Sequence, residues 1–193
     1  VLFRSYGTLT THYRMHQQTA NLINVFYKNC LKEADDTTKQ TEGFDIFNVN
    51  SSNSIEAMLA TSRTIFIESE LEKHSKIHKG EATRVVKIIK TIKEKLSDNF
   101  TETSLGVITP WRAQIAEIKK QLQNENIDNI TVDTVERFQG SEKDIIIVSL
   151  AIFVKEQLNQ LQSLNFEKTI DRKMIVTLSR AKQQIIILGY KQV

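Results

Sequence analysis

The sequence predicts a three-layer α/β domain, in which a mainly parallel sheet is covered by helices on both faces. The first observation behind this prediction is the run at residues 145–148, Ile-Ile-Ile-Val, which is too apolar for a strand with one face in water. The second is that short apolar segments alternate along the chain with longer segments of helical periodicity. The length of 193 residues, 40% of them hydrophobic and 25% charged, suits a single domain over residues 1–193.

The N-terminal third contains one clear helical pattern and one polar stretch. Apolar residues recur at helical spacing within residues 17–31, namely Leu22, Ile23, Phe26, Tyr27 and Leu31. Residues 32–62 are rich in Lys, Asp, Thr, Gln, Asn and Ser, so we expect a polar surface excursion there. Residues 64–68 then predict a short strand.

After His78 the hydrophobic pattern becomes regular. Pro110, the only proline, is expected to end a strand, and residues 153–165 are expected to be helical or irregular. The other elements predicted in order are a helix containing Val85 to Leu96, a strand at 105–109, a helix containing Ile115, Ile118 and Leu122, and strands at 130–135, 144–151, 174–178 and 184–188.

Composition and cysteine usage limit the cellular setting. The net charge of +3 permits a polyanionic partner without requiring one. The single cysteine, Cys30, excludes an internal disulfide and is expected to be a small buried residue in an apolar helix. No apolar run approaches the roughly 18 residues of a membrane span, and no secretion signal is visible, so we expect no membrane partner and a cytoplasmic location. Because the chain begins at Val1 rather than methionine, we expect it to be trimmed from a longer polypeptide.

A phosphate-binding loop of the G-x-x-x-x-G-K-[ST] type is missing from this sequence. None of its six glycines is followed by Lys and then Ser or Thr. No apolar strand ends in an Asp-Glu pair suited to holding magnesium. The domain alone is therefore not expected to be a complete P-loop ATPase.

Four segments carry residue types suited to nucleotide chemistry. They are HYRMH at 12–16, GVITPWRAQ at 106–114, TVERFQGSEKD at 134–144 and MIVTLSRAK at 174–182. Together they resemble the motifs of the second RecA-like motor domain of Upf-like superfamily I helicases, which include the nonsense-mediated-decay helicase and the Okazaki-flap nuclease-helicase. All four occur in the family order. The resemblance covers residues 12–16 and 106–189 well and residues 32–78 hardly at all.

The resemblance implies that this chain is half of an ATP-dependent motor. ATP and Mg²⁺ would be held mainly by a first motor domain, with its Walker A and B motifs, that this chain lacks. Arg14 and Arg180 match the two arginine fingers, which stabilise charge on the transferred phosphoryl group. By the same resemblance Tyr13 would stack on the base, Glu142 would accept a hydrogen bond from the ribose, and Gly140 would let the backbone approach closely.

The resemblance also places single-stranded DNA or RNA across the tops of the sheet strands. Thr109 and Thr134, at predicted strand ends, match positions that contact phosphates without reading the base sequence. Arg112, in the first turn of a predicted helix, is a further candidate for the same partner.

Each assignment has a plainer alternative. Arg14 is alternatively a surface or salt-bridging arginine, Arg180 a helix-capping or exposed one, and Glu142 an ordinary loop residue. The threonines are ordinary strand residues. At the level of the whole domain, the alternative function is a non-catalytic nucleic-acid-binding module that kept the RecA-like fold.

The remaining polar and aromatic residues predict structural roles. The histidine pairs His12/His16 and His74/His78 have a spacing that can chelate zinc, but without a nearby cysteine or acidic third ligand we expect no metal site. Trp111 is expected to pack, and the lysines at 87, 90, 93 and 95 to form a solvated helix face. His78 stands where the family usually has an asparagine before Glu81, one of several departures that suggest a divergent branch.

Overall fold

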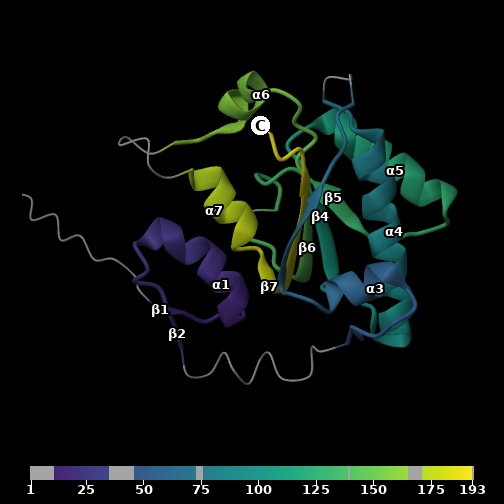
Figure 1. The fold of residues 1–193 in the computed structure, drawn as a ribbon, viewed down its shortest axis with the longest axis horizontal. Coiled ribbons are helices and arrows are strands. Elements are labelled where there is room, and N and C mark those ends of the chain that lie inside the picture. Colours follow the sequence, from purple (N-terminus) through teal and green to yellow (C-terminus); the bar gives the residue numbers. More distant parts are fainter. Residues whose placement is uncertain (1–10, 35–45, 73–75, 139, 165–170, 193) are drawn as a thin grey trace, which may run out of the picture.

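The computed structural model describes residues 11–34, 46–72, 76–138, 140–164 and 171–192. At its centre is a five-stranded sheet in the order β3-β7-β6-β4-β5, in which every neighbouring pair is parallel. The predicted parallel sheet is therefore confirmed (Figure 1). A separate parallel pair is formed by β1 (Thr11–His12) and β2 (Lys32–Glu33). The strands of the central sheet are β3 (Thr64–Glu68), β4 (Leu105–Ile108), β5 (Thr131–Asp133), β6 (Lys143–Ser149) and β7 (Ala181–Gly189).

Helices cover both faces of this sheet, as Figure 1 shows. On one face pack α3 (Ser54–Leu59), α4 (Lys79–Leu96) and α5 (Arg112–Asn124). On the other pack α1 (Gln17–Asn24) and α7 (Arg172–Leu178), with α6 (Lys155–Leu161) beyond α7. Short 3₁₀ turns follow α1 at Val25–Tyr27 and α4 at Ser97–Asn99. Among the described residues, no helix is long and apolar enough to cross a membrane.

The middle of strand β6, residues 145–148, shows why its sequence is entirely apolar. Ile145 and Ile147 join the core beneath α4 and α5, whereas Ile146 and Val148 join the core beneath α1 and α7. All four side chains are buried, since each face of a central strand is covered by helices. The expectation drawn from this run is therefore confirmed.

The segment predicted as a strand at 174–178 is helical, so that prediction was wrong. The Asp171 side chain accepts hydrogen bonds from the backbone N–H groups of Lys173 and Met174, which caps the N-terminus of α7. Met174, Ile175 and Leu178 then face the core at helical spacing. A short apolar run fits either period, and the cap decides in favour of helix.

Cys30 is exposed, contrary to the expectation of a buried residue. The helix that would have buried it ends at Asn24, followed by a short 3₁₀ turn. Lys28 and Asn29 then adopt left-handed backbone angles, with φ of 54° and 58°. This reversal turns the chain away from the helix axis before Cys30 is reached.

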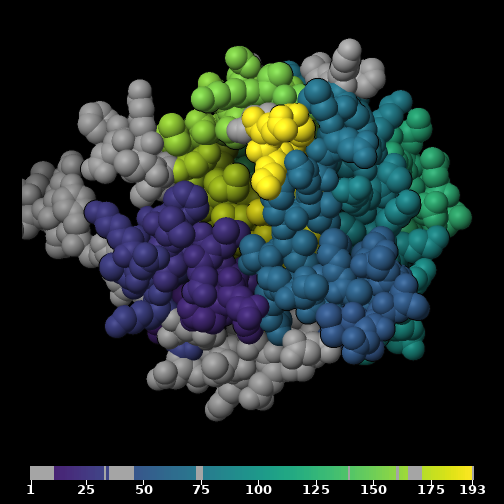
Figure 2. Space-filling model, in the orientation of Figure 1, coloured from purple at the N-terminus to yellow at the C-terminus, as the bar shows by residue number. Residues whose placement is uncertain are grey.

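Part of the polar stretch at 32–62 contributes to the core. Asn53 caps α3, and Leu59 on this helix is 2% exposed. The surface of this segment lies directly beside that of α1 (Figure 2). A polar pocket of about 330 Å³ is lined by both segments, by His16 and Gln18 on one side and by residues 59–63 on the other. Residues 35–45 of the stretch lie outside the described residues.

Gly106 in β4 links two of the quoted sequence motifs by packing. A Cβ at this position would lie 2.8 Å from the ring of Phe138, which is 1% exposed. The absent side chain therefore provides the space into which the aromatic ring of the following motif fits.

Candidate functional site

Four charged side chains meet at the edge of the sheet where β6 and β7 begin. Glu142 forms two ion pairs. Its Oε2 lies 2.6 Å from Nε of Arg14, and its Oε1 lies 2.9 Å from Nζ of Lys182. Arg180 lies beside them and donates to the backbone oxygens of Val176 at 3.1 Å and Ser141 at 3.3 Å. We call this group, Arg14, Glu142, Arg180 and Lys182, the charged cluster.

The local fold explains why these residues meet. Glu142 immediately precedes β6, and Arg180 and Lys182 flank the first residue of β7, the neighbouring strand. Arg14 reaches them from the segment before α1, where the backbone N–H of His16 bonds to the carbonyl of Lys182 at 2.7 Å. Arg14 also donates to the carbonyl of Ser179 at 3.3 Å. Three segments that are distant in sequence are thus held together by backbone as well as ionic contacts.

The electrostatics of the cluster follow from two cations paired with the Glu142 carboxylate and a third, Arg180, beside them. The hydrogen bond from Lys182 has the largest effect on the pKa of Glu142 and lowers it; burial opposes this, and the charges of Lys182 and Arg14 lower the pKa further. Partial burial, and then the nearby positive charge of Arg14, lowers the pKa of Arg180. Guanidinium remains charged at physiological pH, so the cluster carries net positive charge at a partly exposed edge.

The other residues predicted to contact a nucleotide lie near this edge and are exposed to solvent. Tyr13, next to Arg14, is 65% exposed. Gly140, in the turn before β6, has a φ of +87°, and a Cβ there would meet nothing within 4 Å. The left-handed backbone angle requires glycine at this position, and the open space leaves the backbone accessible.

The residues predicted to contact nucleic acid lie at the opposite edge of the sheet. Thr109 follows β4 and Thr134 follows β5, so both are at carboxyl ends of strands, about 20 Å along β6 from the charged cluster. Arg112 is exposed in the first turn of α5, and Thr134 is half-buried. Thr109 is fully buried, and its N–H bonds to the carbonyl of Asp133, so its hydroxyl does not reach the surface in this conformation.

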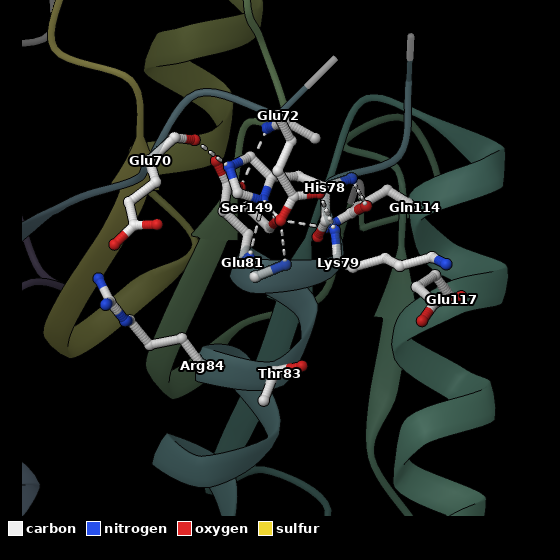
Figure 3. A network of polar contacts seen from close by, with 12 residues as sticks. Glu70, Glu72, His78, Lys79, Glu81, Thr83, Arg84, Gln114, Glu117 and Ser149 are labelled. Atoms are coloured by element: carbon white, nitrogen blue, oxygen red, sulfur yellow. Dashed lines mark hydrogen bonds and ion pairs between the residues drawn. The ribbon is translucent and has the colours of Figure 1, made fainter. Parts of the chain in front are cut away.

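A buried polar network at the same carboxyl edge escaped the sequence analysis (Figure 3). The Glu81 carboxylate accepts from the hydroxyl of Ser149 at 2.7 Å and from the backbone N–H of Ala151 at 3.0 Å. The Gln114 amide donates to the Ser149 hydroxyl and to the His78 carbonyl, each at 3.0 Å. Burial raises the pKa of Glu81, and hydrogen bonds from Ser149 and Ala151 oppose that effect. We call Glu81, Gln114, Ser149 and His78 the buried network.

His78 performs the capping role that an asparagine would otherwise serve. Its Nδ1 accepts the N–H of Glu81 at 3.0 Å at the start of α4, and its Nε2 lies 2.7 Å from the carbonyl of Glu70. Since a carbonyl only accepts, Nε2 is the donor in this contact, and Nδ1 also lies 3.1 Å from a carboxylate oxygen of Glu72. The ring also stacks on Phe153, with centroids 5.3 Å apart. The sequence signal was the position of His78 just before Glu81, but nothing in the pattern showed that both side chains are buried.

The other polar and aromatic predictions have mixed outcomes. Trp111 is 8% exposed and donates from Nε1 to the carbonyl of Leu150 at 3.1 Å, which confirms its packing role. Lys87, Lys90 and Lys95 are exposed on α4 as predicted, whereas Lys93 is half-buried with its Nζ 5.8 Å from the ring centre of Phe100. In the described part of the chain, no group of three or more His, Cys, Asp or Glu residues could hold a metal ion. His74 lies outside the described residues.

The chain is similar to known helicases over nearly its whole length. A family model described as an AAA domain matches residues 4–192. An uncharacterized ATP-dependent helicase of Methanocaldococcus jannaschii is 30% identical over 190 residues, which cover 94% of this chain and 26% of that protein. DNA polymerase alpha-associated DNA helicase A of Saccharomyces cerevisiae is 34% identical over 116 residues, covering 60% and 16%, and helicase sen1 of Schizosaccharomyces pombe is 27% identical over 194 residues, covering 94% and 10%.

The chain thus spans about a quarter or less of the length of these relatives. Its sequence motifs occur in the family order, its fold is a parallel sheet between two helical layers, and the family model matches almost all of its residues. The chain belongs to the AAA domain family, as a helicase domain of the Upf-like branch of superfamily I.

Proposed function

We propose that this chain is the second motor domain of an ATP-dependent DNA or RNA helicase or translocase. The observation that carries the proposal is the charged cluster, where Arg14 and Arg180 lie side by side at one edge of the sheet. Two cations paired with Glu142 and a third, Arg180, beside them suit a nucleoside triphosphate rather than a metal ion. Mg²⁺ and most of the nucleotide would be held by a separate domain with a phosphate-binding loop.

In this proposal Arg14 and Arg180 approach the terminal phosphate when the two domains close. Arg14 is held by Glu142 through Nε, so an arriving phosphate would compete with a carboxylate that is still partly exposed. Arg180 is held by backbone carbonyls, which fix its direction without neutralising its charge. Charge delivered only on closure would couple hydrolysis to domain movement.

The exposed residues beside the charged cluster would contact the rest of the nucleotide. The ring of Tyr13 is free to stack on the base. Glu142 would accept a hydrogen bond from the ribose once Arg14 has turned to the phosphate. Lys182 would keep the Glu142 carboxylate ionised. The backbone at Gly140 would lie against the nucleotide because no side chain covers it.

Single-stranded DNA or RNA would cross the opposite, carboxyl edge. Arg112 and Thr134 would contact phosphates there, and Thr109 would do so through local movement, since its hydroxyl is buried. The separation of the two edges would allow nucleotide and strand to bind the same domain at once. The alternative, a binding module without hydrolysis, would need the carboxyl edge but not the charged cluster.

The test is the strand-stimulated ATPase of the polypeptide that contains both motor domains. Arg180→Ala should lower the stimulated kcat about a thousandfold, the range found for arginine fingers. Arg172→Ala, exposed at the first residue of α7 and outside the cluster, is the matched control and should leave kcat within about twofold. An unchanged rate for Arg180→Ala would exclude the finger role.

The isolated 193-residue chain gives a second test. It should hydrolyse essentially no ATP, because it has no phosphate-binding loop. Robust turnover by this chain would overturn the division of the site between two domains.

A further inference from the structure

An apolar pocket lies at the carboxyl edge, between the sheet and helices α6 and α7. Its volume is about 120 Å³. The sheet side contributes Ile108, Val148 and Leu150, and the helices contribute Leu158, Leu161 and Met174. This space is open to the surface and suits a small flat group rather than an extended chain.

The described polar side chains that line this pocket each have a partner within the protein. Glu136 forms an ion pair with Lys173 at 2.9 Å. The Asp171 carboxylate caps α7, and the Thr177 hydroxyl donates to the Lys173 carbonyl at 2.9 Å. An occupant would therefore be held by apolar contact and shape, and not by hydrogen bonds that distinguish one polar group from another.

Two lining residues follow directly on the threonines proposed to contact the strand. Pro110 comes after Thr109, and Val135 comes after Thr134. On the sheet side of the pocket, the carbonyl of Leu150 accepts a hydrogen bond from the indole of Trp111, and the N–H of the next residue, Ala151, donates to Glu81. A strand whose phosphates lay on this edge would thus have a preformed apolar recess within reach of one of its bases.

We propose that this pocket binds one nucleobase of the single strand. The inference rests on the proposed function, because it needs a strand at the carboxyl edge. Every base has an apolar face, so the apolar side chains that the structure describes around this pocket would contact any of the four bases. Such a contact would grip the strand at one position without reading sequence, which suits a motor that moves along it.

The experiment measures binding of the full-length protein to homopolymeric oligonucleotides in which each position in turn is made abasic. An abasic site at one position of the oligonucleotide should lower the affinity about fivefold to tenfold, which is the size of a single base contact. Leu161→Trp, which enlarges a side chain that lines the pocket, should weaken binding of the intact strand by a similar factor and abolish the abasic effect. Asn159→Trp, exposed on the same helix outside the pocket, is the matched control and should behave like the parent.

The outcomes separate this inference from the proposed function. If the parent protein binds the strand equally well whichever position is abasic, the pocket does not bind a base. Its occupant would then be an apolar side chain from another segment. A parent that binds no single strand would exclude the proposed function itself. Photocrosslinking of the parent to a thio-substituted base at the sensitive position needs no variant. An adduct on a lining residue is expected, and an adduct only elsewhere would overturn the inference.

Discussion

The two edges of the sheet place polar groups in opposite environments. In the charged cluster, the side chains of Arg14 and Glu142 are 40% and 39% exposed. In the buried network, His78, Glu81, Gln114 and Ser149 are each 1% exposed or less. Both groups join segments distant in sequence, yet one does so within reach of water and the other inside the protein.

Because of this difference, substitutions in the two groups should affect the protein in different ways. Exposed ion pairs contribute little to folding because water competes with them. The charges of the charged cluster, at the amino ends of β6 and β7 (the amino edge), are therefore free to bind a ligand. A buried polar group is costly unless every partner is present, so the carboxyl edge depends on its network for stability. Variants of the two edges should therefore divide into those that lose activity and those that lose stability.

Glu81→Ala should produce the largest loss of stability. The substitution removes the acceptor for the Ser149 hydroxyl and for the N–H of Ala151, which has a left-handed φ of 46°. Two buried donors without partners should lower the free energy of unfolding by about 3 kcal/mol. Urea unfolding of the chain measures this, and a loss below about 1 kcal/mol would show that the network is dispensable.

Glu81→Gln is the matched variant, because its amide oxygen still accepts both hydrogen bonds. Burial raises the pKa of Glu81, so the folded state keeps its proton at pH values where the unfolded state has lost it. Parent stability should therefore fall as pH rises from about 4.5 through the raised folded value, and the Gln variant should lack this slope. Equal slopes in the two proteins would contradict this account of the buried carboxylate.

Gly140→Ala should have an intermediate effect at the amino edge. The added Cβ meets no atom within 4 Å, so the cost comes only from forcing φ of +87° on a residue with a side chain. We expect about 1 kcal/mol in the free energy of unfolding. Gly140→Asn should cost less, because asparagine tolerates left-handed angles. If Gly140 lies against the nucleotide, Asn should restore stability but not ATPase activity in the two-domain protein.

The sequence was most informative where a single local signal decided the structure. The strand β4 was located to within one residue because an apolar run ends at Pro110. The apolar run at 174–178 was misassigned because its side chains fit either period, and the deciding feature was the capping carboxylate of Asp171 before it. Local patterns thus predicted strands well where a breaker bounded them.

The candidate site was predictable where sequence motifs marked it and hidden where packing made it. Motif resemblance singled out Arg14, Glu142 and Arg180, and the fold brings them together. The partner Lys182 lay in a quoted motif but had no assigned role. Glu81 meets Ser149 across 68 positions, because α4 lies over the sheet beside β6. Only the strand order determines that contact, and no periodicity in either segment indicates it.

Glu142→Gln should have the smallest effect on folding while testing the same contrast most directly. The pKa of Glu142 is lowered in the folded protein, so its stabilising contribution is present above the ordinary value of 4.5 and is lost as pH falls through the folded value. Because the pair is partly exposed, the variant should lose less than about 1 kcal/mol at pH 7. Urea unfolding at pH 7 should show this difference shrinking in high salt, and it should disappear at pH values low enough to protonate Glu142 in both states. A loss as large as that of Glu81→Ala would mean that the charged cluster also holds the fold together, and its residues would then no longer be free to exchange partners with a nucleotide.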